Sequence, residues 1–284
     1  MVTSLVRVAA GIFALALAAQ AAPVRIVSTF PSVTETLFAL GAGDHVVGVS
    51  NYCRFPPAVL ALPKVGSFSK PDPEKIALLR PDLVIIDKSS SGLGERLSAL
   101  GIRHADVKLG SLADVYTMIQ DIGAATGLDD RAEKLNAGIR SRLNAVRAEV
   151  GKEAAKGDAR PSVLIVLGRT PGQLTGLVAV GRGTYLGELL EIAGGRNAME
   201  ETAIAYPRIS LETVVRANPD VIVDLSSMGR ADTDEHLREP WLGRRELTAV
   251  RNGKVFGLTA EPLTTPGPRV VNAVELLRET IRNK

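Results

Sequence analysis

Residues 129–156, DDRAEKLNAGIRSRLNAVRAEVGKEAAK, decide the fold class of this chain. The stretch is long and contains no proline, and its apolar residues recur at the spacing of one helix face: Leu135, Ile139, Leu143 and Val146. We therefore expect one long helix here, ended by Gly157 and Asp158. The segments before and after this helix have a different pattern, and they resemble one another.

Short apolar runs alternate with helical patterns on both sides of the long helix. The runs that predict strands are residues 24–28, 46–49, 83–86, 163–167, 221–224 and 255–258. The patterns that predict helices are residues 32–40 (with Ser32 as the N-cap), 74–79, 94–100, 112–127, 185–193, 211–217 and 269–282. Such alternation predicts a largely parallel sheet covered by helices on both faces.

The two halves also repeat two short signals in the same order. Glu35 and Glu188 each stand six residues before a glycine that ends a predicted helix. Glu74 and Glu212 each stand seven residues before a Pro-Asp pair that leads into a strand rich in valine and isoleucine. Either signal could recur by coincidence, but two signals in the same order favour a pseudo-repeat.

We therefore predict an α/β protein of two Rossmann-like lobes, joined by one long backbone α-helix and separated by a ligand cleft. The expected divisions are a signal peptide at residues 1–21, an N-terminal lobe at 22–127, the connecting helix at 128–158 and a C-terminal lobe at 159–284. A stiff helix as the only connection predicts small lobe movements rather than wide hinge opening.

The N-terminus has the three parts of a secretory signal peptide. A basic segment, residues 1–7, precedes an apolar run at residues 8–19, and Ala19-Gln20-Ala21 gives the small-x-small pattern of a cleavage site. The run is short for a resident membrane span, and an N-terminal membrane anchor is the alternative interpretation. We expect export to the periplasm without a lipid anchor, because no cysteine lies near the cleavage site.

The composition argues against several kinds of partner. Cys53 is the only cysteine, which excludes an internal disulfide. The net charge is +3 and no basic run is interleaved with aromatic residues, so we expect no nucleic acid partner. The histidines, His45, His104 and His236, are far apart and form no metal-binding pair, so we expect no metal site and no resident cofactor.

No catalytic motif is apparent, neither a G-x-S-x-G elbow nor a dinucleotide fingerprint nor a phosphate-binding loop. We therefore expect a binding protein rather than an enzyme. Two other functional classes are alternatives. One is an exported enzyme that uses the cleft for catalysis, and the other is a chaperone or adhesion module. Basic residues near the C-terminus are expected to form a solvated helix face: Arg278, Arg282 and Lys284.

The loops that follow the predicted strands are expected to rim the cleft, because open α/β sheets bind ligands beyond the carboxyl ends of their strands. Four residues in these loops are candidates for ligand binding: Tyr52, Phe68, Arg169 and Tyr206. Aromatic rings, some with a polar tip, can grip and orient a flat or bulky ligand. Packing of each ring against its own lobe is the alternative, and Trp241 is expected to fill the core of the second lobe.

Glu74 and Glu212 are expected in the first turns of two helices, after the N-caps Asp72 and Ser210. The helix macrodipole favours an acid at such a position whatever its function. A matched acid in each half is better explained by docking, in which one acid on each lobe meets a basic socket on a two-subunit partner.

The ordered motifs resemble those of the helical-backbone periplasmic receptors, which serve ABC importers of cobalamin, siderophores and haem. They extend over nearly the whole mature chain: residues 24–28, 31–35, 40–43, 46–50, Tyr52 with Pro56-Pro57, 81–84, 206–207, 210–212, 218–220 and 249–255. The resemblance implies a monomeric receptor that carries a small ligand to a dimeric ABC permease in the inner membrane. It also implies that Glu74 and Glu212 dock on arginines of that permease.

Within this superfamily, Ser50-x-Tyr52-x-x-x-Pro56-Pro57 is most similar to the vitamin B12-binding branch. This similarity implies a corrinoid ligand, cobalamin or another metal chelate, contacted by Tyr52. Phe68 and Tyr206 stand where that branch has tryptophan. Leu174 and Leu263 stand near positions where it carries large aromatic residues, so the pocket is expected to hold fewer rings. A ferric siderophore or haem is the alternative ligand.

Overall fold

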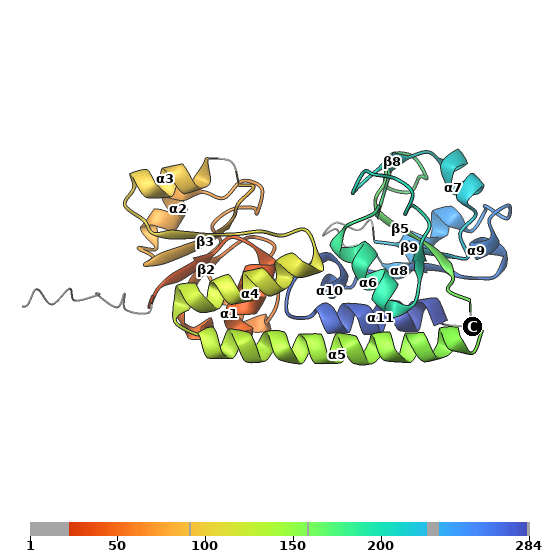
Figure 1. Ribbon diagram of the computed structural model, residues 1–284. Helices are drawn as coiled ribbons and strands as arrows, with labels where there is room; N and C mark the ends of the chain where they lie inside the picture. Colours follow the sequence, from red (N-terminus) through yellow and green to blue (C-terminus); the bar gives the residue numbers. More distant parts are fainter. Residues whose placement is uncertain (1–22, 91, 158, 226–232, 283–284) are drawn as a thin grey trace, which may run out of the picture.

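Two α/β lobes lie side by side over one long helix in the computed structural model, which describes residues 23–90, 92–157, 159–225 and 233–282 (Figure 1). The long helix is α5 (Asp129–Ala155), as predicted from the sequence, and it runs along both lobes. The predicted signal peptide and Lys284 lie outside the described residues. Within the described ranges, no helix is both long and apolar enough to cross a membrane.

The N-terminal lobe is built on a four-stranded parallel sheet in the order β2-β1-β3-β4. The strands are β1 (Ile26–Ser28), β2 (Val46–Val49), β3 (Leu83–Asp87) and β4 (His104–Val107). The helices are α1 (Pro31–Ala39), α2 (Pro73–Leu78), α3 (Leu93–Ala99) and α4 (Leu112–Thr126), with 3-10 turns η1 (Gly43–His45) and η2 (Pro57–Ala61). Every residue of β3 is buried, as expected for an inner strand of a parallel sheet.

The C-terminal lobe has a mixed sheet in the order β10-β9-β5-β6-β8, with β7 also paired to β5. The strands are β5 (Ser162–Gly168), β6 (Leu177–Ala179), β7 (Arg196–Asn197), β8 (Arg208–Ile209), β9 (Val221–Asp224) and β10 (Val255–Gly257). The helices are α6 (Tyr185–Ala193), α7 (Leu211–Ala217), α8 (Asp234–Arg238), α9 (Thr248–Arg251), α10 (Glu261–Thr264) and α11 (Val270–Arg282), with a 3-10 turn η3 (Glu239–Trp241).

The structure corrects the prediction of secondary structure at several places. Ser32 is not the N-cap of α1: Phe30 is, and Pro31 takes the first helical position, where its fixed φ suits a helix and its missing N–H has no role. The strand β4 was not predicted, nor were the antiparallel strands β6 and β8. These last two are three and two residues long, too short for an alternating pattern to show.

The lobes are joined by more than α5. One cluster of buried apolar side chains includes Leu37 of α1 and Ile119 of α4 as well as Leu189 of α6 and Leu277 of α11. Helix α6 of the C-terminal lobe contacts both α4 and α5. The predicted connection through one long helix is confirmed, and the shared apolar core is an addition to it that the sequence did not predict. A shared core resists relative movement more strongly than one helix would, because separating the lobes would expose apolar surface.

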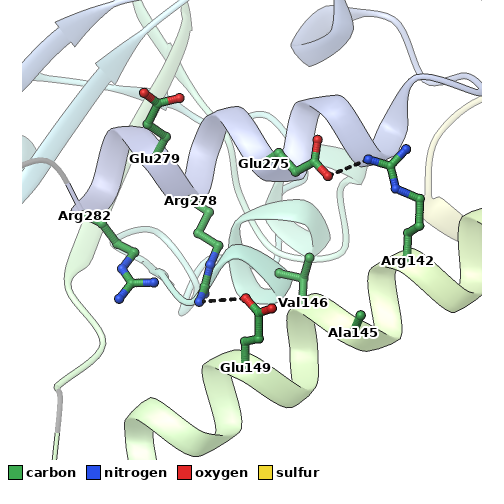
Figure 2. A pocket seen from close by; sticks show the side chains of 8 residues that line it. All are labelled: Arg142, Ala145, Val146, Glu149, Glu275, Arg278, Glu279 and Arg282. Carbon is green, nitrogen blue, oxygen red and sulfur yellow. Dashed lines mark hydrogen bonds and ion pairs between the residues drawn. The ribbon is translucent and has the colours of Figure 1, made fainter.

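Helix α11 lies along α5, and charged side chains fasten the two together (Figure 2). Arg142 of α5 pairs with Glu275 of α11 at 2.6 Å, and Arg278 pairs with Glu149 and Glu153 of α5. The Arg278 side chain is largely buried, so the expected solvated face is wrong for this residue. Its aliphatic stem packs in the helix interface while its guanidinium meets the carboxylates of α5.

Candidate functional site

Three aromatic rings form one cluster on the N-terminal lobe. Phe68 lies between the other two, with ring centroids 5.1 Å from Tyr52 and 5.4 Å from Phe30. Tyr52 is 44% exposed and Phe68 is 38% exposed, so the cluster presents apolar surface to solvent. Two predicted ligand-binding residues are thus brought together, and Phe30 is an addition that the sequence analysis missed. Its place in the turn between β1 and α1 was the available signal, because such turns lie beyond strand ends.

Backbone contacts fix the two loops that carry this cluster. The Asn51 N–H donates to the carbonyl of Gly66 at 2.8 Å, and the Ser50 N–H donates to the carbonyl of Ser28 at 3.1 Å. Gly66 has φ +103°, and a Cβ there would lie 2.8 Å from the Lys70 carbonyl oxygen. A side chain at this position would collide with the backbone of residues 70–72 and distort the loop that carries Phe68.

Tyr206 is the exposed ring of the C-terminal lobe, at 48%. It lines a cavity of about 410 Å³ whose walls come from both lobes. The N-terminal lobe contributes Leu109 and Gly110, and the remaining lining residues are Leu167, Gly168, Val178, Tyr185, Leu186, Tyr206, Leu263, Thr264 and Pro266. Tyr52 and Phe68 do not line this cavity. The structure therefore places Tyr206 at a boundary between the lobes, with burial raising the pKa of its phenol.

The segment that carries Tyr206 is held against the edge of the sheet. The Gly181 N–H donates to the Ala205 carbonyl at 2.8 Å, and the Ala179 N–H donates to the Pro207 carbonyl at 3.0 Å. A Cβ at Gly181 would lie 2.1 Å from the Ile204 carbonyl oxygen. Only glycine permits this close approach, which sets the position of Tyr206 relative to the cavity.

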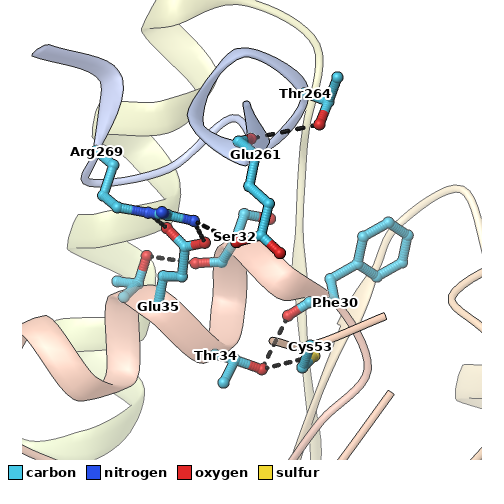
Figure 3. Close-up of polar contacts among 9 residues, drawn as sticks. Phe30, Ser32, Thr34, Glu35, Cys53, Glu261, Thr264 and Arg269 are labelled. Carbon is cyan, nitrogen blue, oxygen red and sulfur yellow. Dashed lines mark hydrogen bonds and ion pairs between the residues drawn. The ribbon is translucent and has the colours of Figure 1, made fainter. Parts of the chain in front are cut away.

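An ion pair joins the two lobes (Figure 3). Arg269, just before α11, donates to Glu35 of α1 from Nε at 2.9 Å and from Nη2 at 2.5 Å, and also to Glu261 at 3.3 Å. The Glu35 side chain is almost fully buried. Burial raises the pKa of Glu35, and pairing with Arg269 opposes only part of that rise. In the sequence, Glu35 is marked only by its distance from Gly41, and nothing there predicts its pairing with Arg269.

Arg269 also contacts Phe55, which lies in the same loop as Tyr52 and the buried Cys53. The guanidinium Cζ lies 4.1 Å from the ring centroid of Phe55. Cys53, two residues earlier, is buried with its Sγ 3.1 Å from Thr34 Oγ1, and burial raises the pKa of its thiol (Figure 3). The Cys53 side chain therefore belongs to the core of the N-terminal lobe, while Phe55 reaches toward the other lobe.

Arg169 does not extend into a cleft. Its Nε donates to Asp224 Oδ2 at 2.8 Å, with the two side chains 3% and 0% exposed, and its Nη2 donates to the Leu237 carbonyl. Trp241, fully buried as predicted, donates from its indole nitrogen to the same Asp224 oxygen. The Arg169 guanidinium makes its contacts inside the C-terminal lobe. This geometry therefore does not support the predicted contact between Arg169 and the ligand.

Glu74 and Glu212 are both exposed, in the first turns of α2 and α7. Their predicted N-caps are present, since the side chains of Asp72 and Ser210 accept hydrogen bonds from the backbone three residues on. The two helices lie on different lobes, on the side of the molecule away from α5 (Figure 1). This arrangement is compatible with the predicted docking role, which needs both acids accessible.

The described part of the chain offers no evident metal site. Among the described residues, no three histidine, cysteine or carboxylate side chains gather where they could hold a metal ion. His45 and His236 are exposed and His104 is half-buried, in line with their predicted surface or edge positions. The side chains at the lobe boundary can instead offer rings, hydroxyls and apolar surface to a ligand.

Residues 26–262 match the periplasmic binding protein family. The chain belongs to this family. It is 32% identical over 264 residues to an uncharacterized ABC transporter substrate-binding lipoprotein of Bacillus subtilis, covering 91% of this chain and 80% of the relative. It is 29% identical over 253 residues to the vitamin B12-binding protein of Vibrio cholerae, covering 88% of this chain and 86% of the relative.

The fold is also similar to that of a periplasmic heme binding protein from Pseudomonas aeruginosa. The TM-score is 0.80 at 28% identity, with 91% of this chain and 92% of that chain covered. The protein is therefore a periplasmic substrate-binding protein of an ABC transporter, within the superfamily that binds vitamin B12, haem and siderophores. Such proteins bind small ligands and work with a membrane permease. The relatives are binding proteins and not enzymes, as the sequence analysis expected.

Proposed function

We propose that this protein captures a corrinoid, of the vitamin B12 type, between its two lobes and delivers it to a permease in the inner membrane. The observation that carries the proposal is the set of exposed rings on opposite lobes. Tyr52 and Phe68 form a contiguous aromatic surface on one lobe, and Tyr206 lines the cavity at the boundary with the other. Exposed rings that cluster into one apolar patch, as Tyr52 and Phe68 do, are typical of a binding surface.

Flat rings can hold a macrocycle by stacking and by excluding water from its faces. The similarity to the Vibrio cholerae vitamin B12-binding protein supports this choice of ligand. Haem is the second candidate, favoured by the similarity in fold to the Pseudomonas aeruginosa heme binding protein. A ferric siderophore is the third ligand class of this superfamily.

Glu74 and Glu212 would seat the receptor on a dimeric permease, one acid for each permease subunit. Their exposure on separate lobes, on the side away from α5, supports this arrangement. Two symmetric basic sockets would hold both lobes and align the ligand with the pore, and charge pairs at the rim of an interface mainly set orientation and association rate. We expect the receptor itself to be a monomer.

The proposal includes export to the periplasm without a lipid anchor, with cleavage that leaves Ala22 or Pro23 as the mature N-terminus. The Bacillus subtilis relative is named a lipoprotein, so relatives give no support for a free mature N-terminus. Edman sequencing and intact mass of the protein from a periplasmic fraction would decide this point. A lipid-modified or uncleaved N-terminus in the membrane fraction would refute it.

A thermal-shift screen of the purified mature protein tests the ligand. The probes are cyanocobalamin, cobinamide, haemin and ferrioxamine B. A ligand that binds only the folded state raises the melting temperature by mass action, by an amount that grows with ligand concentration. A concentration-dependent rise with cyanocobalamin or cobinamide supports the corrinoid proposal. A rise with haemin or ferrioxamine B alone would replace it with the corresponding alternative.

A further inference from the structure

Phe55 belongs to the N-terminal lobe, but its ring contacts the C-terminal lobe. The guanidinium Cζ of Arg269 lies over the ring, 4.1 Å from its centroid. Cation–π attraction acts within about 6 Å, so this contact is a close one. Phe55 is nevertheless 41% exposed. A cation thus lies over one face of the ring, while part of the residue stays accessible to solvent.

The cation behind the ring is held rigidly. Arg269 makes two hydrogen bonds to Glu35, at 2.9 Å and 2.5 Å, and a third to Glu261 at 3.3 Å. A planar guanidinium held by two parallel hydrogen bonds has a fixed orientation. The ring that stacks on it is therefore also restrained before any ligand arrives, which lowers the entropy lost on binding.

Phe55 also lies close along the chain to both sets of exposed rings. It follows Tyr52 by three residues in the same loop, and Arg269 follows Pro266, a lining residue of the cavity beside Tyr206, by three residues. Gly267 between them lies against α1, where a Cβ would be 3.5 Å from the Ser32 Cα. The stacked pair therefore stands at the boundary between the lobes.

We propose that the open part of the Phe55 ring contacts the ligand, and that Arg269 behind it favours flat, electron-rich conjugated ligands. The inference rests on the proposed function and narrows its ligand class. A cation on one face draws the π electrons of the ring toward itself and leaves the other face less negative. Such a face attracts an electron-rich conjugated system by offset stacking, and it offers less attraction to a cationic group than an unpaired ring would.

This chemistry separates the candidate ligands. Corrin and porphyrin macrocycles present a broad conjugated face that can stack on a ring. Ferrioxamine B wraps its iron in aliphatic arms and hydroxamate groups and presents no comparable face. The Phe55 and Arg269 pair is therefore expected to contribute to binding of the macrocycles and to contribute little to binding of ferrioxamine B.

The test compares four proteins by isothermal titration with cyanocobalamin, haemin and ferrioxamine B: the unaltered protein, Phe55→Leu, Phe55→Tyr and Phe256→Leu. Phe55→Leu keeps apolar bulk but removes the ring, and Phe55→Tyr keeps the ring. Phe256, half-buried on β10, is the matched control for loss of a phenylalanine elsewhere. Circular dichroism and melting temperature establish that each variant folds, and Phe55→Met replaces Phe55→Leu if the latter does not.

Of cyanocobalamin and haemin, one will bind the unaltered protein more tightly. We expect Phe55→Leu to weaken the binding of that macrocycle about tenfold, a loss typical of an aromatic contact in a binding site. Phe55→Tyr should restore most of the affinity, and Phe256→Leu should change it less than about twofold. Macrocycle affinity unchanged in Phe55→Leu would overturn the inference while leaving the proposed function intact. Tighter binding of ferrioxamine B than of either macrocycle by the unaltered protein would overturn the stated selectivity. Absence of binding by all three probes would overturn the proposed ligand classes, and this inference with them.

Discussion

Glu35 and Arg269 are 234 positions apart in the sequence and form a buried, two-hydrogen-bond ion pair between the lobes. The Glu35 side chain is almost wholly out of water and that of Arg269 largely so. Removing one partner of such a pair leaves the other without its counter-charge, which costs more than the net contribution of the intact pair.

A double-mutant cycle tests the strength of this pair. Glu35→Ala and Arg269→Ala should each lower the free energy of unfolding by about 2–4 kcal/mol, and the double variant should lose less than the sum. Urea unfolding followed by circular dichroism measures all four stabilities. Arg142 and Glu275 pair at the exposed surface of the α5–α11 interface and serve as the control, with an expected coupling of about 0.5 kcal/mol or less. Equal coupling in the two cycles would contradict the importance of the pair between lobes.

The raised pKa of Glu35 gives a pH dependence with a definite sign. The folded protein keeps the Glu35 proton to a higher pH than the unfolded chain, whose carboxyl titrates near its ordinary value of 4.5. From about that pH up to the raised pKa, the unfolded state binds fewer protons, so the contribution of this group to stability falls as the pH rises. Glu35→Gln removes the titration, and its stability should fall less steeply over this window.

Urea unfolding of the unaltered protein and Glu35→Gln at intervals between pH 4 and pH 8 measures that difference. Glu275→Gln, an exposed carboxylate on α11, is the control and should follow the unaltered protein closely. Parallel stability curves for the unaltered protein and Glu35→Gln would mean that the Glu35 pKa is the same in the folded and unfolded states.

The rings of Tyr52 and Tyr206 are predicted to contact the same ligand from opposite lobes. Tyr52→Ala and Tyr206→Ala should each weaken its binding at least about tenfold, because a lost aromatic contact typically costs about 1 to several kcal/mol. Both side chains are exposed, so the melting temperature of the free protein should change little. Isothermal titration measures the affinity, and Tyr116→Ala, on α4 beneath Arg140, is the control. Unchanged affinity in both cleft variants would place the pocket elsewhere.

Arg169 is predicted to stabilise the folded protein rather than to bind the ligand. Arg169→Ala would remove a buried ion pair and the hydrogen bond to the Leu237 carbonyl, so the free energy of unfolding should fall by about 3–5 kcal/mol. Arg169→Ala with Asp224→Asn should recover part of the loss, since one buried charge is removed together with the other while the Trp241 indole keeps a hydrogen-bond acceptor. If Arg169→Ala were as stable as the unaltered protein but bound the ligand more weakly, Arg169 would instead have a role in ligand binding.

Glu74 and Glu212 are predicted to affect transport without affecting the affinity for the ligand. Glu74→Arg with Glu212→Arg should leave ligand affinity unchanged and abolish uptake, through repulsion from basic sockets as well as lost attraction. The matched control reverses two exposed acids on the side of α5 and α11, Glu133→Arg with Glu279→Arg, and should transport normally. Uptake of labelled ligand into cells that express the cognate permease is the measurement. Normal uptake by the Glu74 and Glu212 variant would refute docking through these acids.

The sequence predicted elements whose signals are local and missed relationships that only the folded chain creates. Helix α5 was predictable because twenty-seven residues without proline carry a consistent apolar face. The exposed rings Tyr52, Phe68 and Tyr206 were predictable because they lie in predicted loops of a protein with few aromatic residues. The Glu35–Arg269 pair has no local signature, since its partners belong to distant segments. Arg169 shows the opposite error, because a residue in a cleft loop can turn its side chain inward.

Cys53 has a practical consequence for following lobe movement in solution. Its thiol is the only one in the chain, is shielded from water, and is kept protonated by its raised pKa, so alkylating reagents will react with it slowly in the native protein. One cysteine introduced on the surface of each lobe could then be labelled with fluorescent dyes without first removing the native residue. Energy transfer between the dyes would report the separation of the lobes in single molecules, with and without ligand. The shared core and the ion pair between the lobes predict a narrow distribution of transfer efficiencies that shifts little when ligand is added.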